Sequence, residues 1–186
     1  MSFLSVLAAP YLRWRHSKGY GVHSPYAFSI VESCIRPGPY GYYGYQAIER
    51  ILMRQNLEKW HKKEAFLILR LAINIPARKL IVSQKDMLIS AIAKAADIPL
   101  TILNKGGKQN LEGGFIVCKK GDMTEEKIIE MVGEGLSALV FNPSKNLVKK
   151  ITTVVSRGMI MEGKRVLLVV PRNEMSLVSY KMKFLI

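Results

Sequence analysis

Cysteine and histidine are scarce in this sequence, whose 186 residues include two cysteines and three histidines. Cys34 and Cys118 lie far apart, each beside apolar residues, so neither belongs to a metal-binding pair. Both are expected to be reduced thiols in a cytoplasmic protein. The histidines lack the spacing of metal ligands, and no Ser/His/Asp set or pair of carboxylates can be assembled elsewhere. The sequence therefore predicts no metal site and assigns no catalytic residue.

Acidic residues are also few. The chain has 14 Asp and Glu against 28 Lys and Arg, a formal net charge of +14 at pH 7. The basic excess is spread along the sequence and forms no tail. A surface of this charge attracts polyanions such as nucleic acid or anionic lipid. It is also compatible with a solvated basic surface that has no partner.

No apolar run near the N-terminus is long enough to span a bilayer, and we expect no transmembrane segment. Residues 1–16 place their positive charge after a short apolar run, which is the reverse of a signal peptide. Two interpretations of this segment remain. It forms an amphipathic helix on a membrane, with Trp14 and the arginines at the interface, or it packs on its own domain.

The first 75 residues have a helical pattern. Ser24 and Pro25 are a typical helix start, a capping side chain followed by a proline at the first helical position. His23 stands directly before this cap. The apolar residues from Gln46 to Ala72 recur at helical spacing, with a break expected near His61.

The rest of the chain alternates between strand and helix patterns. Strands are expected at residues 79–83, 100–104, 114–119, 137–142 and 164–170, and helices at 87–96, 124–135 and 144–159. Because the strands are nearly all apolar, they favour a parallel sheet covered on both faces. We predict one structural domain of the α/β class. Residues 76–186 form a Rossmann-like core with a mostly parallel sheet and helices on both faces, and residues 1–75 form a helical N-terminal extension packed on it.

In such a sheet, ligands bind beyond the carboxyl ends of the strands. The loop after the first predicted strand contains no glycine, although glycines normally let this loop approach a ligand. The second strand ends in Asn104, where a carboxylate would bind a ribose hydroxyl, and the fourth ends in Asn142, where an acid would face the reactive centre. Asp122 is an acid placed to meet an adenine or ribose, but its Gly-Asp pair is also common in turns. The candidate ligand-binding residues are Ser83, Gln84, Lys85, Asn104, Asp122 and Asn142.

Two stretches carry a resemblance to a known family. KGYGVHSPYAFSIVESCI (18–35) and GPYGYYGYQAIERIL (38–52) resemble the N-terminal signature of a bacterial family of class I S-adenosylmethionine-dependent methyltransferases. In that family a His-Ser-Pro-Phe stretch and a tyrosine-rich turn precede an IER-type helix. The order of elements from Phe66 to about Val170 also agrees. The resemblance implies S-adenosylmethionine as the cofactor and a small-molecule methyl acceptor as the substrate.

The chain departs from this family pattern in its core. Ile81, Ser83 and Met87 stand where the family has an acidic residue and glycines, and Asn142 corresponds to an aspartate. Too few residues follow Val170 for the usual last helix and two closing strands. We therefore expect a shortened, motif-degenerate member whose cofactor site is impaired, truncated at its C-terminus.

Two features of the resembling segment have alternative roles. His23 lies at a helix N-terminus, where the helix dipole favours the neutral ring. It either donates a hydrogen bond to a ligand or braces the extension against the sheet. The tyrosines of the turn either stack with bases or pack against the following helix; they are Tyr40, Tyr42, Tyr43 and Tyr45.

Two functions follow from these patterns. The first is a methyltransferase-like protein with an impaired cofactor site. The alternative is a non-catalytic protein that uses its basic surface to bind nucleic acid or another polyanion. In that case we expect weak association without sequence preference.

Overall fold

The computed structural model describes residues 10–16, 18–36, 42, 44–54, 61–103 and 109–183. Residues 10–16 are helical. The labelled helical elements are α2 (Pro25–Ile30), the π-helix η1 (Val31–Ile35), α3 (Tyr45–Arg54), α4 (Lys62–Asn74), α5 (Met87–Ala95), α6 (Glu125–Gly133) and α7 (Lys145–Val154). The strands are β1 (Lys79–Val82), β2 (Leu100–Ile102), β3 (Gly114–Lys119), β4 (Ser137–Phe141), β5 (Arg157–Glu162), β6 (Val166–Ser176) and β7 (Val178–Lys181).

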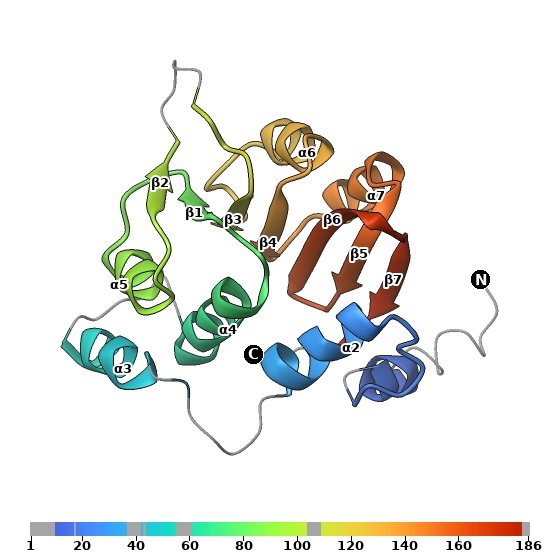
Figure 1. Ribbon diagram of the computed structural model, residues 1–186, viewed down its shortest axis with the longest axis horizontal. Helices are drawn as coiled ribbons and strands as arrows, with labels where there is room; N and C mark the ends of the chain where they lie inside the picture. Colours follow the sequence, from blue (N-terminus) through green and yellow to red (C-terminus); the bar gives the residue numbers. More distant parts are fainter. Residues whose placement is uncertain are drawn as a thin grey trace.

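Within the described residues, seven strands form one sheet in the order β2-β1-β3-β4-β6-β5-β7 (Figure 1). The pairs β1–β2, β1–β3, β3–β4 and β5–β7 are parallel. Strand β6 runs antiparallel to both of its neighbours, β4 and β5. All strands except β6 therefore point the same way, so the carboxyl ends of the parallel strands share one edge of the sheet.

Helices cover both faces of the sheet, because alternate strand residues point to opposite sides. In β1, Leu80 and Val82 belong to a core cluster shared with α2, η1, α4 and α5, whereas Ile81 belongs to a second cluster shared with α6 and α7. The helical N-terminal part thus packs on one face. This arrangement confirms the predicted fold class, a Rossmann-like α/β fold with a mostly parallel sheet.

The C-terminal part differs from the sequence prediction. The helix expected at 144–159 ends at Val154, and residues 157–162 form β5 instead. The strand expected at 164–170 is the first part of the longer β6, which forms an antiparallel hairpin with β5, and β7 was not predicted. The physical reason lies at Gly158, whose φ of +120° is incompatible with a continued helix. Methionines on either side of Ile160 are good helix formers, so local preference indicated the wrong element.

Polar contacts fasten the π-helix η1 to the rest of the N-terminal part. The Tyr42 hydroxyl donates to the Ser33 carbonyl at 2.7 Å, and Arg70 Nε donates to the Cys34 carbonyl at 2.6 Å. Tyr45 stacks on Phe66, with ring centroids 3.9 Å apart. Tyr42 and Tyr45 therefore pack within the protein rather than forming a base-stacking surface. Tyr40 and Tyr43 lie outside the described residues.

Candidate functional site

The carboxyl edge of the sheet is where the sequence predicted ligand-binding residues. Ser83, Gln84 and Lys85 lie in the loop between β1 and α5, with Ser83 half-buried and the other two exposed. Asp122 follows β3, and Asn142 follows β4. Asn104 lies outside the described residues. The strand pairing brings the ends of β3 and β4 together, since Lys119 lies opposite Phe141.

An acidic residue of the loop after β1 caps the helix that follows it. Asp86 is the N-cap of α5, and its Oδ1 accepts a hydrogen bond from the Ile89 amide at 3.1 Å. This carboxylate therefore satisfies one of the free amides of the first turn and lies at the positive end of the helix dipole. In related folds that position holds an anionic group of a ligand. Here such a group would meet the negative charge of Asp86.

Asp122 also bonds within its own turn. Its Oδ2 accepts a hydrogen bond from the Lys119 amide at 2.9 Å, and the Asp122 amide donates to the Lys119 carbonyl at 3.0 Å. Gly121 has a φ of +92°, which glycine adopts without strain. The Gly-Asp pair is thus part of a tight turn after β3.

A half-buried ion pair lies between β3 and α4. Lys119 Nζ is 2.8 Å from Glu64 Oε2, and the two side chains are only 19% and 11% exposed. The same Glu64 oxygen accepts a hydrogen bond from the His61 amide at 3.1 Å, which caps the start of α4. Limited access to water makes this pair stronger than a typical surface ion pair. Glu64 and Lys119 are 55 residues apart, and no pattern in the sequence indicates that they meet.

Asn142 links the end of β4 to the turn between β5 and β6. Its φ is +53°, a left-handed conformation that asparagine tolerates better than most residues. Its amide donates to the Arg165 carbonyl at 2.6 Å. The backbone therefore explains an asparagine at this position without any ligand, and it places Arg165 at the carboxyl edge.

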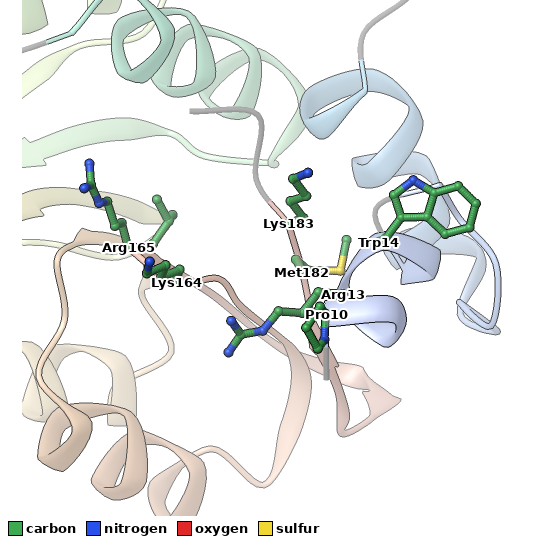
Figure 2. A pocket seen from close by; sticks show the side chains of 8 residues that line it. Pro10, Arg13, Trp14, Lys164, Arg165, Met182 and Lys183 are labelled. Carbon is green, nitrogen blue, oxygen red and sulfur yellow. The ribbon is translucent and has the colours of Figure 1, made fainter. Parts of the chain in front are cut away.

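A cavity of about 440 Å³ opens beside this turn (Figure 2). Its walls come from the helical residues 10–16, the β5–β6 turn at residues 163–165 and the segment that follows β7. We call it the basic pocket, because four of the eight described residues that line it carry a positive charge. The lining residues are Pro10, Arg13, Trp14, Lys164, Arg165, Val166, Met182 and Lys183.

The charges around the basic pocket are only partly balanced. Glu162, next to the turn, forms an ion pair with Lys181. Burial lowers the pKa of Lys181, and the nearby positive charge of Arg13 lowers it further. Lys164 and Arg165 form no ion pair with the part of the chain that the structure describes, and both are exposed.

Contacts to β7 hold the N-terminal helix against this wall of the pocket. His16 Nδ1 lies 2.9 Å from the Lys181 carbonyl oxygen, and its ring meets the Tyr180 ring edge-on at 5.4 Å between centroids. In Figure 1 the blue N-terminal helix accordingly lies next to the red C-terminal strands. The first described residues thus form one wall of a site built mainly from the last strands.

An aromatic surface adjoins the basic pocket. Trp14 lines the pocket and is 46% exposed, and Tyr11 is 58% exposed. Their rings stack with centroids 6.2 Å apart and planes at 21°. The Arg15 guanidinium lies 5.8 Å from the Tyr11 ring centre. We call Tyr11 and Trp14 the aromatic pair.

His23 is exposed at the start of α2. Ser24 caps this helix, and its hydroxyl oxygen accepts a hydrogen bond from the Ala27 amide at 3.3 Å. In the first turn of the same helix, the Arg172 guanidinium lies 4.4 Å from the centre of the Tyr26 ring. Within residues 18–36 and the other described ranges, no hydrogen bond or ion pair joins His23 to the residues of the carboxyl edge. The structure therefore does not connect His23 with the candidate site.

Sequence reasoning missed most of the basic pocket. Lys164, Arg165 and Lys183 were not among the predicted site residues, since the sequence pattern predicted a helix and a single strand where the structure has the β5–β6 hairpin. The adjacent cations in GKRV (163–166), between two apolar segments, were the available signal for an exposed basic turn.

No protein-family model, curated protein or solved structure matches this chain. Conclusions about its function therefore depend on its own residues. In the part of the chain that the structure describes, no helix has the length and apolar character needed to cross a membrane.

Proposed function

We propose that this chain uses a methyltransferase-like scaffold to bind a polyanion, such as nucleic acid, and that its S-adenosylmethionine site is impaired. The observation that supports this most directly is the basic pocket, where four cationic side chains of the described residues line one cavity at the carboxyl edge of the sheet. A net charge of +14 adds long-range attraction for the same class of ligand.

The residues at the carboxyl edge fit S-adenosylmethionine poorly. This cofactor carries a sulfonium cation and ribose hydroxyls, which acidic side chains recognise. The acids nearby bond to the protein itself: Asp86 caps α5, Asp122 closes a turn and Glu64 pairs with Lys119. Each charge-assisted hydrogen bond that is not formed costs about 1.5–3 kcal/mol of binding free energy. We therefore assign no methyl-transfer step to these residues.

We also propose a cytoplasmic location, which the absence of a disulfide between the two cysteines supports. Neither Cys34 nor Cys118 forms a disulfide within the part of the chain that the structure describes, and both side chains are buried. Paired cysteines are typical of secreted proteins.

The salt dependence of polyanion binding tests the proposal. We expect the association constant for mixed-sequence nucleic acid and for heparin to fall steeply with salt, because each neutralised phosphate or sulfate releases counterions. Replacing both exposed cations of the turn, Lys164→Gln with Arg165→Gln, should weaken binding. It should also reduce the salt slope by about 0.7–0.9 for each phosphate that is no longer neutralised.

The matched control removes the same charge elsewhere. Lys149 and Lys150 are exposed on α7, which packs on the other face of the sheet from α4 and α5. Lys149→Gln with Lys150→Gln should leave binding and slope nearly unchanged. Equal weakening in the two double variants would show that overall charge, not the pocket, attracts the ligand. No binding even at low salt would refute the proposal.

A further inference from the structure

We propose that the basic pocket and the aromatic pair together bind single-stranded nucleic acid, with a backbone phosphate in the pocket and a base stacked on Trp14. This inference rests on the proposed function, which requires only a polyanion. It adds the class of polyanion and the residue that distinguishes it.

The first support is that one residue belongs to both features. Trp14 lines the pocket and also stacks with Tyr11, so the aromatic surface begins where the cationic surface ends. Sites for single strands combine a positively charged groove with aromatic side chains on which bases stack. In a nucleotide the phosphate and the base are likewise close together, as the cationic pocket and the Trp14 ring are here.

The second support is the exposure of the aromatic pair. Large aromatic side chains at 46% and 58% exposure leave apolar surface in water, which is unfavourable unless a partner covers it. The Arg15 guanidinium beside Tyr11 extends the positive charge along this surface. Arginine near an exposed ring contributes both phosphate pairing and stacking.

The third support is the shape of the cationic surface. Arg13, Lys164 and Lys183 come from three different segments and line the same cavity (Figure 2). A single strand can place a backbone phosphate inside this cavity and still present an unpaired base to Trp14. In a duplex the bases are paired and stacked, so they cannot reach the ring. A bilayer presents its phosphates as a broad surface, which matches a concave site less well.

Fluorescence of Trp14 provides the direct test. The sequence has two tryptophans, Trp14 and Trp60, so a Trp60→Phe background leaves Trp14 as the reporter. We expect a short oligothymidylate to quench this emission on binding. Heparin should bind without quenching, because it has no base to stack. A duplex of the same length should bind without quenching for the reason given above.

Variants in the same background separate stacking from charge. Trp14→Leu should weaken oligothymidylate binding roughly tenfold, measured by fluorescence anisotropy of a labelled strand, and leave heparin binding unchanged. The control is Phe28→Leu, because Phe28 is an aromatic residue of matched exposure, 44%. It should change neither. Circular dichroism of each variant checks that the fold is retained.

The outcomes distinguish this inference from the proposed function. If heparin and oligothymidylate both bind and Trp14→Leu weakens neither, the polyanion site stands and the inference fails. If neither binds, both fail. Binding of phosphatidylserine vesicles with a blue shift of Trp14 emission, without oligothymidylate binding, would assign the surface to a membrane and overturn the inference.

Discussion

Arg70 is a buried cation that connects α4 to two earlier segments. Only 6% exposed, it donates from Nε to the Cys34 carbonyl of η1 and from a terminal nitrogen to the Tyr45 hydroxyl at 2.8 Å. The wider turns of a π-helix leave carbonyls that need outside donors. The Arg70 guanidinium therefore has a structural role, which is to stabilise the π-helix, and we assign it no ligand.

We expect Arg70→Met to lower the free energy of unfolding by about 3 kcal/mol, because a buried carbonyl loses its donor. Urea denaturation measures this decrease. The control Arg78→Met removes a side chain that is 77% exposed and should cost less than about 0.5 kcal/mol. Equal stability of wild type and Arg70→Met would contradict this role.

The Cys34 thiol is predicted to make stability depend on alkaline pH. Burial raises the pKa of Cys34 to about 11, from an ordinary value of 9.0. Between these values the folded protein keeps a proton that the unfolded chain releases, so stability falls as pH rises above 9. The fall is at most about 1.4 kcal/mol per pH unit.

The measurement is the free energy of unfolding from pH 8 to 10, compared with Cys34→Ala. This variant should lack the Cys34 contribution, which begins near the ordinary pKa of 9.0. Burial also raises the pKa of Tyr42 above its ordinary value of 10.0, so tyrosines add their own dependence above that range. Identical curves for the two proteins below pH 10 would show that the thiol does not titrate as described.

At the scale of elements, the β5–β6 hairpin depends on one glycine. A Cβ at Gly158 would lie 2.3 Å from the Val170 carbonyl oxygen and 2.8 Å from the Arg172 amide, with φ at +120°. We expect Gly158→Ala to destabilise the protein by about 3 kcal/mol or more, since steric overlap adds to backbone strain.

Gly135→Ala is the matched control for this prediction. Gly135 has a φ of +92°, but a Cβ there would meet nothing within 4 Å. Its substitution should therefore cost only the backbone strain, about 1–2 kcal/mol. Urea denaturation of both variants separates the two effects, and equal destabilisation would remove the steric contribution.

The same hairpin shows where sequence patterns stop being informative. Apolar, β-branched runs such as residues 79–83 and 137–141 identified strands correctly, because a buried parallel strand leaves few other options. Residues 159–161 have apolar side chains that suit helix and strand alike. Their strand conformation comes from pairing with β6, a tertiary interaction that local preference does not encode.

The candidate site was predictable only in its location. The carboxyl edge follows from strand order, and the missing glycines and acids were visible in the sequence. The sequence did not predict that Lys119 pairs with Glu64. It also did not predict that Arg13, Lys164 and Lys183 line one cavity. Both features depend on how elements that are distant in the sequence pack together.

At the scale of the whole molecule, the proposal predicts a weak response to S-adenosylmethionine. Calorimetric titration with the cofactor or with S-adenosylhomocysteine should give weak or undetectable binding, since Asp86, Asp122 and Glu64 are engaged by the chain. A low-micromolar dissociation constant would contradict this. If weak binding is seen, Asp122→Ala should reduce it, and an unchanged affinity would remove Asp122 from the site.

Because of how the basic pocket is built, ligand binding there also reports whether the chain is folded. Its walls come from residues 10–14, 164–166 and 182–183, so they meet only when segments from the two halves of the sequence have come together. An unfolded chain has no such cavity, and a ligand specific for it binds the native state alone. At a hundredfold excess over its dissociation constant, such a ligand adds about 2.7 kcal/mol to the stability of the fold. The bound polyanion would thus stabilise the packing of the helix at residues 10–16 against the C-terminal strands.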